Sequence, residues 1–182
     1  MNRLDILVSC PRGVRKGVLR RLTKALVCDL LDLREALLEI NVVSAKEMRH
    51  LNETFLEHKG PTDVITFDYA ALDDASGRET TQQSIEARTA IHGEIFICLD
   101  VAGQQARRFG VTTAKELARY VIHGVLHLLG YDDKRPQARR RMKGREGSLL
   151  RALERRCDFS GLVGQTGRTS QTGQTSRTPG SQ

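Results

Sequence analysis

The chain of 182 residues contains no tryptophan, and aromatic residues make up only 4% of it. Its core must therefore consist mostly of leucine, valine, isoleucine and alanine, which is ordinary for a small α+β protein. The shortage of aromatic side chains also argues against a sheet that stacks nucleobases on its surface. One domain is expected at this length, because two domains would each have too little chain to bury a core.

The four cysteines are widely spaced and form no CxxC pair. This spacing argues against a zinc knuckle and a disulfide framework, and small buried apolar side chains are the better interpretation. No apolar run approaches the roughly 20 residues that a membrane span requires. The first residues also lack the longer apolar segment of a secretory signal. We therefore expect a cytoplasmic protein that does not enter a membrane.

Acidic residues are scarce at both flanks of the chain, although the net charge is only +7. Residues 1–30 hold seven basic and two acidic side chains, and residues 134–156 hold ten and two. Residues 31–133 hold ten basic and seventeen acidic side chains. An acidic centre between basic flanks suits a metal-holding site beside polyanion-binding segments. Two solvated helix faces would explain the distribution equally well.

Hydrophobic periodicity predicts one α+β domain with a mixed four-stranded sheet packed with about five helices. The expected strands are 4–9, 36–44, 62–70 and 91–100. The expected helices are 15–33, 45–56, 101–108, 113–129 and one that follows residue 136. Two capping-box patterns mark helix starts, one at Ser44 and Glu47 and one at Thr113 and Glu116. The last helix should point Met142, Leu149, Leu150 and Leu153 inward.

Two segments have compositions that do not favour a packed structure. Residues 72–89 are polar and have no sustained apolar period, so we interpret them as a long loop. From Gly161 onward the chain is mostly Gly, Ser, Thr and Gln, with near repeats such as GQTGRTSQTGQTSRT. That composition offers little to bury, so we expect a domain over residues 1–160 and a disordered tail over 161–182.

Two histidines lie four residues apart in the stretch HGVLHLLGYDD, which begins at residue 123. On a helix this spacing places both imidazoles on one face, where they can close on a single ion. Gly130 is suited to the left-handed turn that ends a helix, and that turn would bring Asp133 under the histidines. His123, His127 and Asp133 would then supply three metal ligands and leave one coordination position open, as in catalytic zinc sites.

The spacing also resembles the zinc-peptidase pattern HExxHxxGxxH, apart from two positions. Gly124 stands where such peptidases keep the glutamate that acts as general base, so peptide hydrolysis would lose its usual base. Asp133 stands where the third histidine would be, which keeps the number of ligands and changes the charge of the site. A metallopeptidase is therefore disfavoured.

These residues resemble a known family. HGVLHLLGYDD is similar to the HGxLHLxGYDH signature of the YbeY family of bacterial metal-dependent endoribonucleases, which act in ribosomal RNA maturation. LNETFLEHKGPTDVITF resembles the family's LN-to-PTDVLSF segment, and GEIFI resembles its GDIxI strand. Met142, Glu146 and Leu149 fit its C-terminal helix. The resemblance covers residues 4–157.

The resemblance implies a single-strand-specific endoribonuclease that uses one divalent ion, with Zn²⁺ expected, in 16S 3′-end maturation and ribosome quality control. It also implies RNA, the small ribosomal subunit and its assembly factors as partners. The chain departs from the family at Asp133, where histidine is usual, and at Leu56, where arginine is common. His58, Lys59 and Lys134 are the cations nearest in sequence that could replace this arginine, unless they are only solvated loop residues.

Other assignments stay open. The candidate catalytic residue Glu94 could accept a proton or orient water, but a surface or supporting role explains it as well. Thr62 and Asp63 open the third strand and could brace the site or cap a turn. A second functional class is a non-catalytic, zinc-containing ribosome-assembly factor that binds RNA. A site closed by four protein ligands would favour that class over an enzyme.

Overall fold

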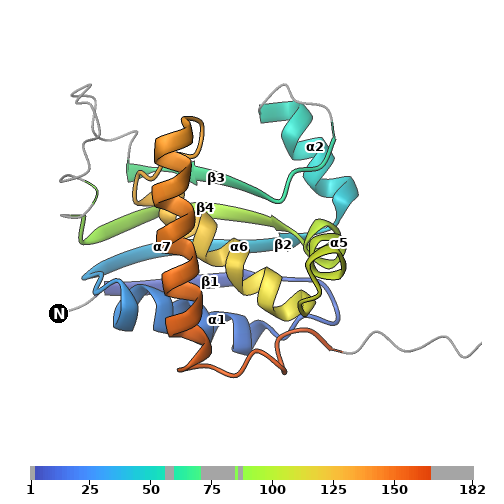
Figure 1. The fold of residues 1–182 in the computed structure, drawn as a ribbon, viewed down its shortest axis with the longest axis horizontal. Coiled ribbons are helices and arrows are strands. Elements are labelled where there is room, and N and C mark those ends of the chain that lie inside the picture. The colour runs from blue at the N-terminus through green and yellow to red at the C-terminus, as the bar shows by residue number, and fades with distance from the viewer. Residues whose placement is uncertain (1–2, 56–59, 71–84, 86–87, 165–182) are drawn as a thin grey trace, which may run out of the picture.

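The computed structural model describes residues 3–55, 60–70, 85 and 88–164. These residues form one four-stranded sheet and five α-helices, with a π-helical segment after the first helix (Figure 1). In chain order the elements are β1 (Arg3–Ser9), α1 (Lys16–Lys24), η1 (Ala25–Leu30), β2 (Glu35–Val43), α2 (Ala45–Phe55), β3 (Val64–Asp68), β4 (Ala90–Cys98), α5 (Leu99–Phe109), α6 (Thr113–Leu128) and α7 (Pro136–Glu154). The predicted α+β architecture is confirmed.

The sheet has the strand order β1-β2-β4-β3. Strands β1, β2 and β4 are parallel, and β3 pairs antiparallel with β4. A parallel pair needs a crossover connection, which α1 and η1 provide between β1 and β2. The sheet is therefore mixed, as the sequence predicts.

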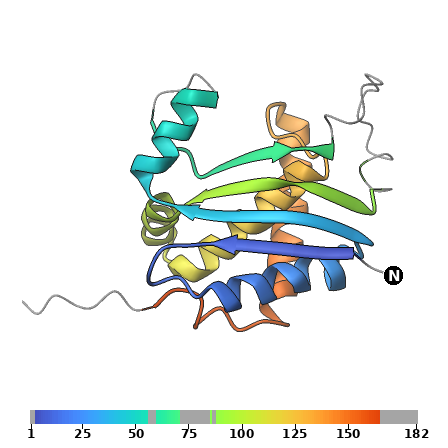
Figure 2. The same cartoon turned by 180° about the vertical axis from the view of Figure 1, so that it is seen from behind.

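Helices α1, α6 and α7 lie on one face of the sheet, as the two opposite views show (Figures 1 and 2). The main core lies between this face and the helices and consists mostly of leucine, isoleucine, valine and alanine, as predicted. A smaller cluster on the opposite face joins Met48 of α2 to Ile65 and Cys98, at the end where β3 and β4 pair. All four cysteines are free; Cys98 is buried and the other three are half-buried.

The start of α2 has the predicted capping box. The Glu47 carboxylate accepts hydrogen bonds from the Ser44 backbone N–H at 2.8 Å and from the Ser44 hydroxyl at 2.7 Å. The prediction for α6 is one residue off, because Thr112 is the N-cap and its hydroxyl accepts from the Lys115 N–H at 3.1 Å. Glu116 therefore does not close a capping box, and its carboxylate is available for another partner.

The first helix ends earlier than the predicted range 15–33, since η1 ends at Leu30. Its hydrogen bonds widen there, and the Leu31 N–H donates to the Leu26 carbonyl at 3.1 Å. Asp32 then adopts a positive φ of 50°, which directs the chain into β2. The 3.6-residue periodicity correctly predicts which face of this segment is apolar. It does not predict where the helix ends, because the turn there requires a positive φ at Asp32, which aspartate adopts less readily than glycine.

The described structure continues beyond residue 160, the predicted end of the domain. Leu162 is fully buried, and its carbonyl accepts the Arg15 N–H at 2.9 Å. Val163 forms a β-bridge with Val14, and the Gly164 N–H donates to the Gly13 carbonyl at 2.7 Å. The domain thus extends through Gly164. Residues 165–182 lie outside the described residues, so disorder of the tail stays a prediction.

Most of the predicted loop 72–89 also lies outside the described residues. Arg88, near its end, donates to the Leu128 carbonyl at 2.6 Å and pairs with Asp68 at 3.3 Å. It therefore satisfies one of the carbonyls left open at the end of α6. Within the described part of the chain, none of the helices has the combination of length and apolar character that a membrane span needs.

We expect that ending the chain after Gly164 leaves the free energy of unfolding unchanged, whereas Leu162→Ala lowers it by about 2–4 kcal/mol because a buried side chain leaves a cavity. Urea denaturation of the full chain and the two variants measures both effects. Val163→Ala, at a half-exposed neighbouring position, is the matched control and should cost less. A smaller loss for Leu162→Ala than for Val163→Ala would contradict the packing described above.

Candidate metal centre

The last turns of α6 carry both histidines of the predicted site. Their Nε2 atoms face each other at 3.0 Å, and their rings lie 4.6 Å apart between centroids. Gly130 adopts a φ of 96°, which turns the chain back and places Asp133 beside them. The ligand atoms of His123, His127 and Asp133 all lie within 4.8 Å of one another, and all three residues are half-buried. The structure therefore brings together the predicted set.

The second nitrogen of His127 has a fixed partner. Its Nδ1 lies 3.1 Å from the Tyr131 carbonyl oxygen, which can only accept, so Nδ1 carries the hydrogen and Nε2 presents its lone pair. Burial, followed by the charge of His123, lowers the pKa of His127. A neutral imidazole with Nε2 unprotonated is the form that ligates a metal ion.

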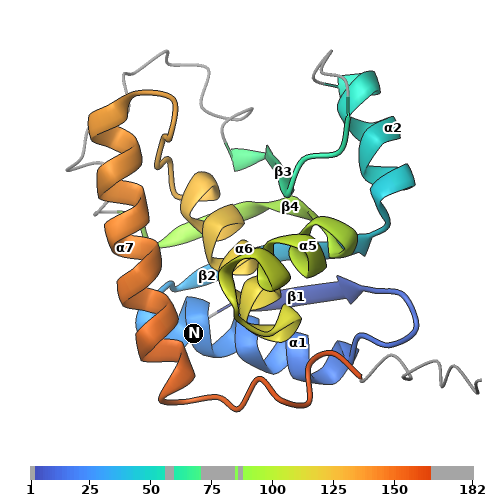
Figure 3. The same ribbon diagram turned by 45° about the vertical axis from the view of Figure 1, so that its right-hand side comes forward.

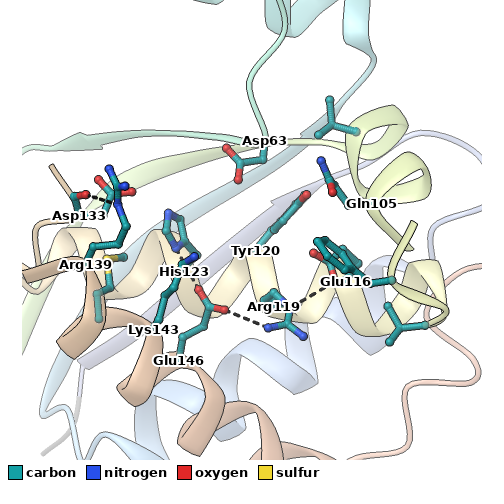
Figure 4. A pocket seen from close by; sticks show the side chains of 14 residues that line it. Asp63, Gln105, Glu116, Arg119, Tyr120, His123, Asp133, Arg139, Lys143 and Glu146 are labelled. Atoms are coloured by element: carbon teal, nitrogen blue, oxygen red, sulfur yellow. Dashed lines mark hydrogen bonds and ion pairs between the residues drawn. The ribbon is translucent and has the colours of Figure 1, made fainter. Parts of the chain in front are cut away.

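The second nitrogen of His123 faces a buried carboxylate. Its Nδ1 lies 3.1 Å from Glu146 Oε2 on α7, and Glu146 is only 8% exposed. Arg119 donates to the other Glu146 oxygen at 3.2 Å and, through Nε, to Glu116 at 3.2 Å. Figure 4 shows this chain of side chains along α6 and α7. It fixes the orientation of the His123 ring, as carboxylates behind metal-ligating histidines do.

The surroundings of His123 favour a cation. Burial alone would lower the pKa of His123, but the hydrogen bond and charge of Glu146 outweigh it. The charges of Asp63 and Asp133 act in the same direction, so the pKa of His123 is raised. The donor set of two imidazole nitrogens and one carboxylate oxygen fits Zn²⁺, and an ion held there would offset the same negative charges.

The ligands His123 and Asp133 line a cleft of about 920 Å³. Figure 4 shows Asp63 on the opposite side of this cleft and Tyr120 between the two ends. Tyr120 is 4% exposed, and burial together with the charge of Asp63 raises its pKa, so its hydroxyl stays protonated. Arg139 and Lys143 of α7 add positive charge to the wall beside the ligands.

Asp63 is held firmly at the start of β3. Its carboxylate accepts from the Val64 N–H at 3.0 Å and from the Thr62 hydroxyl at 3.1 Å. Its backbone carbonyl accepts the Cys98 N–H at 2.9 Å, which ties it to the end of β4. Of the two open interpretations of Thr62 and Asp63, the structure supports local capping and also places the Asp63 carboxylate in the cleft.

Glu94 is not among the residues that line the cleft, and a catalytic role for it stays a prediction. Side chains alternate along a strand, and neighbouring Ile95 faces α6, so Glu94 points to the opposite face of the sheet. There it accepts from the Asn41 amide at 2.7 Å and from the Tyr69 hydroxyl at 2.9 Å. The sequence shows that Glu94 is on a strand but not which face the helices cover.

Of the three cations predicted to replace the family arginine, the structure describes only Lys134. His58 and Lys59, like Leu56, lie outside the described residues. Lys134 is exposed, and its backbone N–H donates to Asp132 at 3.1 Å. Arg139, which belongs to the basic flank of residues 134–156, donates through Nε to the Asp133 carbonyl at 2.8 Å and lines the cleft.

The supporting carboxylates Glu116 and Glu146 were also missed as functional groups. Each interrupts the buried face of an amphipathic helix, since Glu116 is 4% and Glu146 is 8% exposed. A charged residue at an inward-facing helical position is a usable signal, because burial of a charge is costly unless it is paired. Identifying its partner, however, requires knowing which helices pack together.

Gly124 packs where no side chain fits. A Cβ atom there would lie 2.6 Å from Ile95 Cγ2 and 2.9 Å from Ile95 Cδ1. The position therefore faces the sheet, whereas the histidines of the same helix face the cleft. A glutamate at 124 could not serve as general base without moving α6, which is consistent with the prediction against a metallopeptidase.

Two helix-borne histidines and a carboxylate beside a cleft form a set that could hold a metal ion, an arrangement typical of metal-dependent hydrolases. The chain belongs to the YbeY endoribonuclease family, whose model, described as Endoribonuclease YbeY, matches residues 14–154. It is 40% identical over 144 residues to endoribonuclease YbeY of Chlorobium luteolum, which covers 75% of this chain and 93% of that protein.

Two further similarities agree with this family. Endoribonuclease YbeY of Acidothermus cellulolyticus is 39% identical over 115 residues, which are 63% of this chain and 69% of that protein. A solution structure from Thermotoga maritima has a TM-score of 0.58 and 25% identity, and covers 90% of this chain and 99% of its own. The resemblance read from the signature stretch is therefore confirmed.

Asp133→Ala is expected to lose most of its bound metal, whereas Asp132→Ala should retain it. Of these two aspartates, Asp133 has its carboxylate beside the histidine nitrogens, while Asp132 is exposed and accepts from the Lys134 N–H. Metal analysis after zinc loading and dialysis measures the content of each variant. Loss from the Asp132 variant with retention in the Asp133 variant would reverse the ligand assignment.

Gly124→Ala should lower the free energy of unfolding by about 1–3 kcal/mol, because the new methyl group overlaps Ile95. Gly144→Ala is the matched control, since a Cβ on this α7 residue meets nothing within 4 Å. It should raise stability by up to about 1 kcal/mol through helix propensity. Equal effects of the two substitutions in chemical denaturation would argue against the close contact of α6 and β4.

Proposed function

We propose that this protein is a metal-dependent endoribonuclease that cleaves single-stranded RNA in maturation of the 16S 3′ end and in ribosome quality control. The observation that carries the proposal is a shared cleft, in which the ligands His123 and Asp133 lie beside the cations Arg139 and Lys143. A polyanion needs such cations for affinity, and phosphodiester hydrolysis needs an electrophilic centre next to them. The names of the curated relatives support the same activity.

We propose Zn²⁺ as the ion, held by His123, His127 and Asp133. When bound, the ion supplies Lewis-acid chemistry, which activates water and offsets charge on the phosphate. The protein holds the two imidazoles in their ligating form through the Tyr131 carbonyl and Glu146. Asp133 contributes a negative charge that a third histidine would not, so this centre has a lower net charge than a three-histidine relative.

Asp63 is proposed as the group that accepts a proton during hydrolysis, in place of Glu94. It lies directly before β3 and lines the cleft on the side opposite the ligands. Its carboxylate accepts from the Val64 N–H, and its backbone carbonyl accepts the Cys98 N–H. The Tyr120 hydroxyl, kept protonated by burial, can donate to an oxygen of the bound phosphate. Within this cleft, Asp63 would accept a proton and Tyr120 would donate a hydrogen bond.

Arg139 is proposed as the cation that takes the place of the family arginine at Leu56. Its guanidinium is fixed beside Asp133 by the 2.8 Å hydrogen bond to the backbone carbonyl, and it lines the cleft. It can thus contact a phosphate next to the ion. His58 and Lys59, which follow Leu56 in the sequence, remain further candidates for catalysis.

The proposed partners are single-stranded RNA, the small ribosomal subunit and its assembly factors, which would place the protein in the cytoplasm. A non-catalytic role with a structural zinc is the competing function. Structural zinc sites are normally closed by four protein ligands. The ligand cluster found within the described residues has three, which favours the enzyme.

We expect zinc-loaded protein to cleave single-stranded RNA internally and to lose this activity on chelation. Asp63→Asn should lower kcat by about 100-fold or more, the usual loss for a general base, while metal content is retained. Asp5→Asn, at an exposed position of β1, is the control and should cleave at the wild-type rate. Gel analysis of end-labelled RNA beside the matching duplex measures the products.

Cleavage that survives chelation would exclude the proposed role of the ion. A wild-type kcat for the Asp63 variant would exclude the proposed base. Zinc-loaded protein that binds RNA and leaves it intact, across a range of single-stranded sequences, would favour the assembly factor.

A further inference from the structure

The cleft continues beyond the metal centre to an end of different chemistry. This end is lined by Val101, Gln105 and Phe109 of α5, with Val111 after that helix and Tyr120 of α6. Figure 3 shows α5 beside α6, on the side away from the turn between α6 and α7, and Figure 4 shows Gln105 of α5 at the end of the cleft opposite Asp133. One continuous surface thus joins the candidate metal ligands, with Arg139 and Lys143 beside them, to a region that holds apolar side chains of α5.

Phe109 is 64% exposed, the largest exposure among the large hydrophobic residues of the described chain. The sequence has few aromatic residues, and most large apolar side chains of this fold are buried in its core. An aromatic ring left in water at the edge of a cleft gains nothing for folding. Its position therefore points to a ligand with a flat face.

The ring is presented by a rigid element. Phe109 is the last residue of α5, and Gly110 ends the helix in the left-handed conformation at φ 65°. The Val111 N–H donates to the Ala106 carbonyl at 3.0 Å, which fixes the chain directly after the ring. The Arg108 guanidinium lies 5.6 Å from the ring centroid, so a cation accompanies the aromatic face.

Gln105 lies one helical turn before Phe109, and residues four apart share a face of the helix. Its amide carries both donors and an acceptor, which is what the edge of a nucleobase requires. A base in this end of the cleft could therefore meet a ring on its face and an amide on its edge.

We propose that Phe109 and Gln105 form a nucleobase subsite, in which the ring stacks on one base of a single-stranded RNA and the amide binds its edge. The adjoining phosphate lies toward Arg139, Lys143 and the metal centre. This inference rests on the proposed function, and it differs from the stacking sheet that the composition argues against, because a single ring at a helix end is used. Recognition of single-stranded RNA has two requirements, namely cations that bind the phosphates and an aromatic side chain on which a base can stack.

An apolar peptide side chain is the main other occupant of such a pocket. It would need apolar volume but no flat ring, and it would not use the neighbouring phosphate-binding cations. Arg139 and Lys143 at the metal-ligand end of the same cleft can pair with the phosphates of an RNA backbone, which favours RNA over a peptide. Phe109→Leu separates the two occupants, because leucine keeps apolar volume and removes the aromatic face.

The test uses full-length zinc-loaded protein and a short phosphorothioate RNA that contains one 2-aminopurine and resists cleavage. Stacking on the wild-type protein should quench the 2-aminopurine fluorescence. Phe109→Ala and Phe109→Leu should abolish the quenching and raise Kd about 5- to 150-fold, whereas Phe109→Tyr should retain both properties. Leu7→Ala, at a 57% exposed position of β1 outside the cleft, is the control and should match wild type.

The same oligonucleotide with an abasic residue in place of 2-aminopurine isolates the stacked base. Phe109→Ala should then bind no more weakly than wild type, because no base is left to stack. Wild-type Kd and quenching for Phe109→Leu would overturn the subsite in favour of an apolar side-chain pocket. Equal Kd values for wild type and Phe109→Ala on the complete oligonucleotide would overturn it outright.

The subsite and the proposed function can fail separately. Chelator-sensitive RNA cleavage by Phe109→Ala with a wild-type KM would remove the subsite and leave the nuclease. Quenching and a Phe109-dependent Kd in a protein that does not cleave RNA would support the subsite and remove the nuclease.

Discussion

The close approach of α6 to β4 is the contact on which the site depends. Gly124 on the helix and Gly93 on the strand both lack the Cβ that would block it, since a Cβ at Gly93 would overlap Phe67 and Leu128. Ile95, on the same strand as Gly93, packs directly against Gly124. Because one face of α6 is fixed against the sheet in this way, the opposite face and its two histidines are held toward the cleft.

The second constraint is electrostatic. Glu116, Arg119 and Glu146 are largely buried between α6 and α7, where an unpaired charge would be strongly unfavourable. Arg119 pairs with both carboxylates, and the remaining contact, from Glu146 to His123, fixes the orientation of that ring. A network of this kind adds little to stability compared with an apolar core, so its position behind a metal ligand indicates a functional reason for keeping it.

The cleft joins groups from four separate parts of the chain, each with a different task. The helix α6 and the turn after it supply the candidate ligands, the segment directly before β3 supplies Asp63, α7 supplies Arg139, and α5 supplies Phe109. Each of these side chains is attached to a regular element or directly next to one, so the geometry is held by backbone hydrogen bonds and core packing. Such placement suits a site that must orient a flexible single strand.

Short-range sequence patterns were sufficient to predict much of this structure. Some features depend only on residues that are close in sequence, and these could be predicted. They are the alternation of side chains in strands, the 3.6-residue spacing in helices, the capping box at Ser44 and the histidine pair followed by Gly130. Its signature stretch also carries the family. By contrast, the face toward which Glu94 points, the cleft position of Asp63 and the return of Leu162 to the core depend on contacts between residues far apart in sequence. Periodicity shows which side of a helix or strand a side chain faces, but packing between elements determines what lies on that side. For this reason the metal ligands could be predicted from the sequence, whereas most of the cleft around them could not.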